Sequence, residues 1–136
     1  GLARISEEMA KRGIYVIYQS SNPFIRESNC TPDTAMPQWW HIGNEPPCTY
    51  YTKEESLERR RMYHEALLEL QSKYENFGVL DLFDVFCASD VCRFYNDKGN
   101  FLYRDEWSHP SVEANSLAQP RLLDTVDKLI SNTTIS

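Results

Sequence analysis

The sequence predicts an α/β fold in which a small parallel sheet lies between helices, as a fragment of a three-layer sandwich. Two short runs rich in β-branched and aromatic residues, at positions 14–19 and 77–87, have the composition and length of buried strands. A helical pattern separates them, which makes the connection a βαβ unit and the strands parallel. A short hairpin pattern then precedes a C-terminal helix, so helices and strands alternate along the chain.

The N-terminal part is predicted to contain a helix over residues 2–12, a strand over residues 14–19 and a long loop. Apolar side chains recur at helical spacing up to Ala10, and Gly13 ends this pattern. Residues 20–52 hold five of the seven prolines and show no sustained periodicity. A loop of this length is uncommon in a compact domain and is usually functional or disordered.

The second half is predicted to contain a long helix, the second strand, a short hairpin and a last helix. Thr52 caps the long helix, with Glu55 three residues later completing a capping box. The stretch "RFYNDKGNFLY", residues 93–103, combines alternating polarity with an Asp-Lys-Gly turn, which predicts the hairpin. Ser111 is the expected N-cap of the last helix, in which Pro120 either introduces a kink or begins a second segment.

Length and charge limit the classes of protein to which this chain can belong. With 136 residues it is predicted to be a single domain, residues 1–136. A net charge of -6 without a basic block argues against nucleic acid as a partner. No apolar run approaches the roughly 20 residues that span a bilayer, so we expect this chain to be soluble by itself. It begins inside a helical pattern without an initiator Met or a signal peptide, which predicts a fragment or a processed domain.

Four cysteines form two local pairs in the sequence. Their spacing favours two disulfides, Cys30 with Cys48 and Cys87 with Cys92, in an oxidising compartment. A zinc site is the competing interpretation because His41 lies between the first two cysteines. Neither pair has the two-residue spacing of a zinc knuckle, and we therefore expect disulfides and no metal.

Two sequons indicate where such a protein is located. Asn29 and Asn132 each begin an Asn-X-Thr tripeptide and are predicted glycosylation sites. Disulfides and N-linked glycans both form in the secretory pathway. Together they predict a protein of the secretory-pathway lumen or the cell exterior.

The stretch "YRDEWSHPS", residues 103–111, contains the best candidate for acid–base chemistry. It follows the second strand of a parallel sheet, and such sheets bind ligands beyond the carboxyl ends of their strands. An imidazole such as His109 can take a proton from a hydroxyl nucleophile if a carboxylate fixes its tautomer, and Asp105 or Glu106 is available for that role. A solvated polar turn is the alternative interpretation, because short motifs are weak evidence by themselves.

The order of features around this stretch resembles a known family. From "VLDLFDVFC" to "QPRLLDTV" the chain is similar to the SGNH hydrolase-like domain attached to membrane O-acyltransferases of acyltransferase family 3, particularly its animal and nematode-like members. That domain has a strand with Asp, a cysteine pair, a hairpin, Leu-Tyr with an Asp, a His followed by Ser, and a terminal helix. The matching residues here are Asp81 or Asp84, Cys87, Cys92, residues 101–103, Asp105, His109 and Ser111.

The resemblance implies the C-terminal half of an SGNH or flavodoxin-like α/β domain. It further implies that His109 is a general acid and base and that a carboxylate holds it. The family places this Asp three residues before the His, where the present chain has Glu106, whereas Asp105 lies four residues before. We favour Asp105, because it follows Tyr-Arg as the family pattern requires, and note that His-Pro-Ser replaces the usual His-Leu-Ser.

The nucleophile of that family is missing from this sequence. No Gly-Asp-Ser block is present, and Ser20, Ser21 and Ser89 lack its setting. Since nucleophile and oxyanion donors supply most of acyl-transfer catalysis, the chain is expected to lack its N-terminal nucleophile segment and to be inactive alone. Enzyme function is left open, and a catalytically inactive lumenal binding or folding module stabilised by disulfides, or a small secreted protein without enzymatic ancestry, remains as an alternative.

For the complete domain, the resemblance implies an acyl donor and a hydroxyl-bearing acceptor, with water as a second acceptor. No cofactor is expected. Membrane association is expected only through transmembrane helices outside this chain.

Other polar and aromatic residues are interpreted as structural. His64 lies beside the apolar stripe of the long helix and is expected to be solvated or half-buried. The arginine run 59–61 is expected to form a solvated helix face paired with the glutamates before it. Trp39 and Trp40 are expected to pack in the long loop rather than to bind a ligand.

Overall fold

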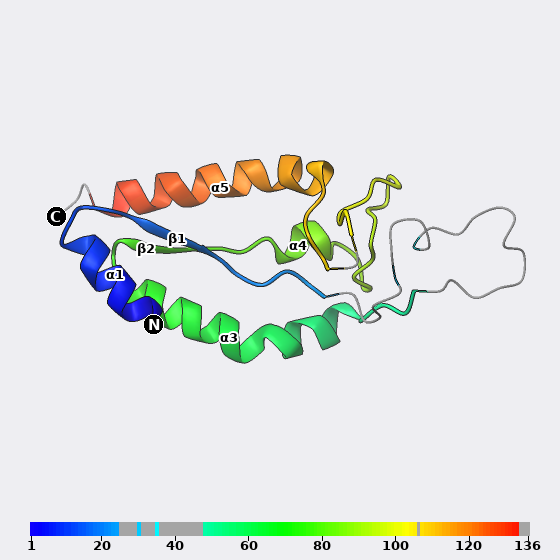
Figure 1. Cartoon of the computed structure of the whole chain (residues 1–136), viewed down its shortest axis with the longest axis horizontal. Coiled ribbons are helices and arrows are strands. Elements are labelled where there is room, and N and C mark those ends of the chain that lie inside the picture. Colours follow the sequence, from blue (N-terminus) through cyan, green and yellow to red (C-terminus); the bar gives the residue numbers. More distant parts are fainter. Residues whose placement is uncertain (25–29, 31–34, 36–47, 106, 134–136) are drawn as a thin grey trace, which may run out of the picture. The chain divides into compact units, whose positions relative to one another are not determined.

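The computed structural model describes residues 1–24, 30, 35, 48–105 and 107–133 of the chain (Figure 1). It consists of two compact units. The sheet unit comprises Gly1–Ser21, Arg60–Leu82 and Gln119–Ser136, and the cysteine unit comprises Asn22–Arg59 and Phe83–Ala118. Two long helices, α3 (Lys53–Lys73) and α5 (Val112–Thr133), contribute residues to both units.

A parallel pair of strands forms the centre of the sheet unit. The strand β1 (Val16–Gln19) pairs with β2 (Phe77–Leu80), in a register that runs from Val16 opposite Phe77 to Gln19 opposite Leu80. The helix α1 (Leu2–Ala10) precedes β1. This arrangement confirms the predicted mixed α/β fold with a small parallel sheet.

Helices cover both faces of this sheet. Tyr18 of β1 meets Tyr63 of α3 edge-on, with ring centroids 6.3 Å apart and their hydroxyls hydrogen-bonded at 2.8 Å. Gly78 of β2 meets Leu129 of α5 instead. Because neighbouring residues of a strand point to opposite faces, and Tyr18 is paired with Val79, α3 and α5 lie on opposite faces.

Backbone N–H groups on the edge of β2 that faces away from β1 donate to acceptors that lie nearby in the sequence. The backbone N–H of Val79 donates to the Gln71 side-chain oxygen at 3.0 Å, and that of Phe77 donates to the Tyr74 carbonyl at 3.0 Å. Both acceptors come from the end of α3 and the turn after it. Buried backbone donors need such partners, and here they find them without a third strand.

Replacing Gly78 by Ala is expected to destabilise the chain by overpacking this contact. An added Cβ would lie 2.7 Å from Leu129 Cδ1, and Leu129 is buried. We expect the free energy of unfolding to fall by about 1–3 kcal/mol, measured by urea denaturation. In a Leu129→Ala background the same change should cost clearly less, because the neighbour is gone. Equal costs in both backgrounds would contradict the contact.

The cysteine unit has an aromatic core. Tyr103 packs against Phe86 and Phe94, with ring centroids at 4.9 and 5.4 Å, and all three side chains are buried. The Tyr103 hydroxyl donates to the Pro23 carbonyl at 2.6 Å, which ties the segment after β1 to this core. Burial raises the pKa of Tyr103, so the phenol stays protonated as a donor.

The predicted ends of both long helices agree with the structure. At α3 the Glu55 N–H donates to Thr52 Oγ1 at 3.1 Å, and the Thr52 N–H donates to the Glu55 side chain at 2.8 Å. At α5 the Ala114 N–H donates to Ser111 Oγ at 3.1 Å. The helix α5 continues through Pro120 as one element.

The predicted second strand and the predicted hairpin differ most from the structure. The second strand ends at Leu80, and residues Phe83–Phe86 form the short helix α4 instead of continuing the strand. Phe83 and Phe86 are both buried, since their spacing of three places them on one side of a helical turn. The predicted hairpin is reduced to a single antiparallel bridge between Tyr95 and Phe101, around a turn in which Gly99 has φ 78°.

Candidate functional site

The "YRDEWSHPS" stretch forms a closed loop in the cysteine unit. At its base Tyr103 and Pro110 form an antiparallel bridge, and the Arg104 N–H donates to the His109 carbonyl at 2.9 Å. Ser111 closes the other end by donating to the Phe101 carbonyl and capping α5. A buried tyrosine on one side and a helix cap on the other therefore hold the loop in place.

Within this loop the structure brings Asp105 and His109 together. Asp105 Oδ2 lies 2.8 Å from His109 Nδ1. The other carboxylate oxygen, Oδ1, accepts the backbone N–H groups of Trp107 at 3.1 Å and His109 at 3.2 Å. The Arg104 side chain lies 3.4 Å from Oδ2. Asp105 thus orients the imidazole with one oxygen and shapes the loop backbone with the other.

These contacts change the acidity of the carboxyl group. Burial alone would raise the pKa of Asp105, but the His109 side chain, the His109 backbone and the Trp107 backbone outweigh this and hold the pKa below its usual range. The carboxylate therefore remains ionised near neutral pH. Its contribution to the stability of the loop is present above the ordinary pKa of about 3.9 and is lost as the pH falls through the lowered value.

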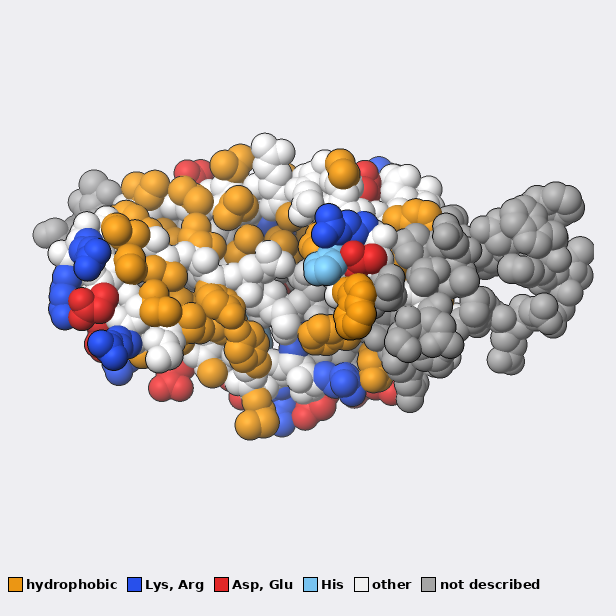
Figure 2. Space-filling model, in the orientation of Figure 1, with side chains coloured by type: hydrophobic (Ala, Val, Ile, Leu, Met, Phe, Trp, Pro, Cys, Tyr) orange, Lys and Arg blue, Asp and Glu red, His pale blue; other side chains and the backbone are white. Residues whose placement is uncertain are grey.

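The loop exposes the side chains of Trp107 and His109 to solvent. Trp107 is 76% exposed, and the His109 side chain is 55% exposed. Between them Ser108 has φ 62°, a left-handed conformation that is uncommon for a residue other than Gly. In Figure 2 a histidine reaches the surface beside an acidic and a basic side chain, with hydrophobic side chains next to them. A solvent-accessible imidazole of this kind can exchange protons with a substrate.

Several residues singled out in the sequence lie outside the described residues. These are Glu106, the glycosylation candidate Asn29, the tryptophans Trp39 and Trp40, and His41. Asn132 lies in the last turn of α5, and its side chain is also outside the description. Among the described residues, Asp105 provides a carboxylate contact to His109.

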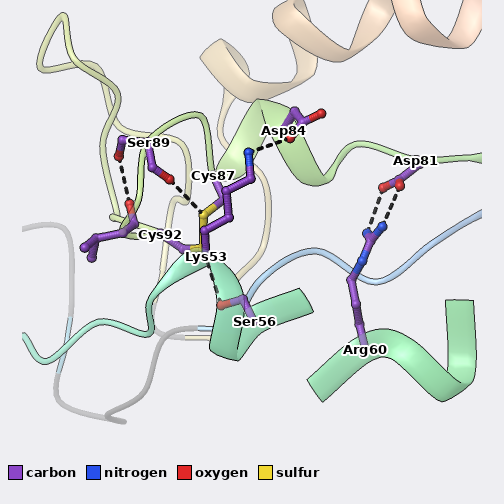
Figure 3. Close-up of polar contacts among 9 residues, drawn as sticks. Lys53, Ser56, Arg60, Asp81, Asp84, Cys87, Ser89 and Cys92 are labelled. Atoms are coloured by element: carbon purple, nitrogen blue, oxygen red, sulfur yellow. Dashed lines mark hydrogen bonds and ion pairs between the residues drawn. A yellow bond between two sulfur atoms is a disulfide. The ribbon is translucent and has the colours of Figure 1, made fainter. Parts of the chain in front are cut away.

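Both predicted disulfides are confirmed. Cys30 bonds to Cys48 and Cys87 bonds to Cys92, with S–S distances of 2.04 and 2.02 Å. All four side chains are buried, and the second bond lies against Phe83. The Ser56 hydroxyl of α3 donates to Cys92 Sγ at 3.3 Å, as Figure 3 shows.

Removal of each disulfide is expected to have a different cost. The bonds span 18 and 5 residues in the sequence. In the chain-entropy treatment these spans correspond to about 3 kcal/mol for Cys30–Cys48 and about 2 kcal/mol for Cys87–Cys92. Paired Cys→Ser variants compared by urea denaturation test this order. A larger loss for the short-span pair would contradict the entropic ranking and assign its effect to packing in the core.

A second polar cluster lies in the sheet unit, at the carboxyl ends of both strands. The Arg60 guanidinium donates to both oxygens of Asp81, at 2.8 and 2.5 Å (Figure 3). His64 lies one helical turn after Arg60, with Nε2 3.7 Å from Asp81 Oδ2 and Nδ1 3.2 Å from Ser20 Oγ. Ser20 directly follows β1, and Asp81 directly follows β2.

This cluster corrects the solvated interpretation of the arginine run. The Arg60 side chain is only 9% exposed and faces Asp81, whereas Arg61 pairs with Glu65 on the helix surface. The half-buried position expected for His64 agrees with the structure. The helical spacing of Arg60 and His64, combined with a polar residue directly after each strand, is the sequence signal that would have indicated this cluster.

Despite its composition, the cluster does not have the geometry of a nucleophilic site. Ser20 is 1% exposed, so its hydroxyl is not accessible to a substrate. Asp81 is engaged by Arg60 in a two-point ion pair, which leaves it poorly placed to stabilise a charged His64. The arrangement holds the ends of the two strands to α3.

Two further findings concern the described residues. No three His, Cys, Asp or Glu side chains among them come together as a metal site would require. Among the helices that the structure describes, none is both long and apolar enough to cross a bilayer.

Comparison with known proteins identifies one family. The model of the SGNH domain (fused to AT3 domains) matches residues 1–124, which is most of the chain. No curated protein and no solved structure matches. The matched range includes Asp105, His109 and both disulfides.

Proposed function

Because this chain belongs to the family of SGNH domains fused to AT3 domains, we propose that it is the acid–base part of a domain that transfers or hydrolyses acyl esters. The observation that carries the proposal is the 2.8 Å contact between Asp105 Oδ2 and His109 Nδ1. A carboxylate in this position selects the imidazole tautomer that carries its proton on Nδ1. The other nitrogen, Nε2, is then the acceptor.

In the complete domain His109 acts twice. Its Nε2 first takes the proton of a serine hydroxyl as that oxygen attacks the acyl donor, and then gives the proton to the departing donor oxygen. The acyl group is now an ester of the serine. His109 next takes the proton of the acceptor hydroxyl, or of water, and returns it to the serine as the new ester or the free acid leaves. Asp105 stabilises the imidazolium in both steps without accepting its proton.

The serine belongs to a Gly-Asp-Ser block of the full-length protein outside these 136 residues, because this sequence contains no such block. The proposed partners are an acyl donor and a hydroxyl-bearing acceptor, and membrane association occurs through helices outside this chain. Two disulfides fit an oxidising compartment, and we propose the extracellular space or the secretory-pathway lumen, with glycans at Asn29 and Asn132.

A catalytically inactive lumenal binding module is the second candidate. The observation that favours it is the missing nucleophile block in a chain whose described cysteines all form disulfides. In such a module the Asp105–His109 contact would only stabilise the loop.

Ester hydrolysis by the full-length protein distinguishes the two candidates. We expect the His109→Ala variant to lose activity by a factor of about 10³ or more, because the proton transfers lose their base. The matched control is His64→Gln, which changes the other described histidine and should leave the rate within a few-fold. Serine-reactive fluorophosphonate labelling provides a second readout. Labelling and hydrolysis that are unchanged in His109→Ala would rule out the acid–base role.

A further inference from the structure

We propose that a pocket in the cysteine unit binds a small zwitterion with one apolar group, as an aliphatic α-amino acid has. The pocket has a volume of about 210 Å³ and is lined by residues of α4, of the disulfide loop 87–92, of the turn that follows and of the start of α5. The described residues that line it include none of the loop 103–111. This site is therefore separate from His109, and it does not depend on the function proposed above.

Part of the lining of this pocket is apolar. Phe86 and Leu102 are buried, whereas Val85 is partly exposed and Leu117 is 44% exposed. A closed apolar cavity of roughly 150 Å³ holds a benzene molecule. A pocket of about 210 Å³ therefore has room for one branched aliphatic group, and removing that group from water favours its binding.

The walls of the pocket are held in place before any ligand binds. A disulfide closes the loop 87–92, which contributes to the lining. In the turn, Asn96 Oδ1 accepts the backbone N–H groups of Lys98 and Asn100, both at 3.0 Å. Glu113 Oε1 of α5 accepts the side-chain amides of Asn96 at 3.4 Å and Asn100 at 3.1 Å. A pocket with walls fixed in this way binds a ligand at a low entropic cost.

Charges of both signs accompany the apolar lining. Arg93 and Lys98 are cationic and Asp97 is anionic, and within the described part of the chain none of the three side chains forms an ion pair. Glu113 adds a second carboxylate, although its Oε1 already accepts two amides. A ligand that fills the pocket therefore meets cations and a carboxylate that both lack a partner of opposite charge.

This mixture of charges favours a zwitterion over a ligand of one sign. An aliphatic carboxylate would pair with Arg93 or Lys98 but would place its charge near Asp97 and Glu113. An aliphatic amine would pair with the carboxylates and meet the two cations. An α-amino acid carries an ammonium group, a carboxylate and one apolar side chain, so each part of the ligand matches a part of the lining.

Three probes with the same aliphatic group test this site in the full-length protein. They are leucine, isocaproate, which lacks the ammonium group, and isoamylamine, which lacks the carboxylate. In saturation-transfer NMR we expect leucine to bind with a Kd of about 1 mM. Each of the other two should bind at least about threefold more weakly, because it loses one ion pair. Equal affinities of the three probes, or tighter binding of a singly charged one, overturn the proposal.

Two charge variants test the orientation of the ligand. Asp97→Asn should weaken leucine binding about threefold without weakening isocaproate binding. Lys98→Met should weaken leucine and isocaproate binding by a similar factor without weakening isoamylamine binding. Both residues are exposed in the turn, so neither change is expected to affect folding. Unchanged leucine binding in both variants overturns the proposal.

A matched pair of α5 variants tests the location of the apolar group. Leu117→Gln changes a leucine that lines the pocket and should weaken leucine binding about fivefold. Leu123→Gln changes a leucine of the same helix that is 56% exposed and does not line the pocket, and it should leave the Kd unchanged. His109→Ala should also bind leucine like wild type. Equal Kd values for Leu117→Gln and Leu123→Gln, or loss of binding in His109→Ala, place leucine elsewhere and overturn the proposal.

Discussion

Replacing Asp105 by Asn is expected to lower kcat for ester hydrolysis by the full-length protein by about three to four orders of magnitude. The side-chain oxygen of Asn can still accept the Trp107 and His109 backbone N–H groups that Asp105 Oδ1 accepts now. The amide nitrogen then faces His109 Nδ1 and donates to it. This selects the tautomer with its proton on Nε2, which cannot accept a proton from the serine.

The Asp105→Asn variant changes the proposed proton transfer without removing the hydrogen bonds that hold the loop. Because the Asn side-chain oxygen still accepts the two backbone N–H groups, Asp105→Asn should unfold at nearly the same urea concentration as wild type. Asp105→Ala should lose both activity and loop order. Asp84→Asn is the matched control, since Asp84 makes an exposed ion pair with Lys53 in the same unit. A rate for Asp105→Asn within tenfold of wild type would show that Asp105 does not orient the base.

A large effect on stability is also expected at the Arg60–Asp81 pair. Asp81→Ala leaves the Arg60 guanidinium, which is only 9% exposed, without its two-point partner. Removal of one member of a buried ion pair typically costs 3–5 kcal/mol, and because Asp81 is partly exposed we expect about 3 kcal/mol in urea denaturation. The double variant Arg60→Leu/Asp81→Leu should recover much of this loss, since apolar side chains replace the pair without leaving a charge.

An exposed ion pair of the same unit provides the comparison for this stability test. Asp124 pairs with Lys128 on the surface of α5, and both side chains are mostly exposed. Asp124→Ala should change the free energy of unfolding by less than about 0.5 kcal/mol. If Asp81→Ala were equally mild, the ion pair would not contribute to stability as its burial predicts.

The parts of the fold that the sequence predicts well are those determined by near neighbours. The Thr52–Glu55 capping box and the Ser111 cap each depend on residues three apart, and both form as predicted. The parallel strands follow from two apolar runs with a helix between them. Both disulfides follow from local spacing of the cysteines.

The parts that were predicted poorly depend on contacts between distant segments. Arg60 and Asp81 are 21 residues apart, and Ser20 and His64 are 44 apart. The helical spacing of Arg60 and His64 indicates this cluster only when it is combined with the polar residues after two distant strands. The second strand, predicted over residues 77–87, is wrong beyond Leu80 for another reason. A short continuous apolar run has the same composition in a strand and in a buried helical turn. The segment is too short for the spacing of its aromatic residues to distinguish the two structures.

The candidate site was only partly predictable for a similar reason. The sequence offered two adjacent carboxylates at nearly the same distance from His109, and the choice depends on how the loop folds. The closed conformation, with Ser108 in a left-handed position, brings Asp105 against the imidazole. Trp107 then remains outside, where no pattern of apolar spacing would have drawn attention to it.

The side chain of Gln71 makes one edge of the sheet less available to a further strand. By accepting the Val79 N–H it takes the place that a carbonyl of a further strand would occupy, and the Tyr74 carbonyl does the same for Phe77. A further strand beside β2 could not pair with the N–H groups of Val79 and Phe77, because both already have acceptors. A further strand beside β2 would have to displace both contacts, so α3 and the turn after it disfavour widening of the sheet at this edge.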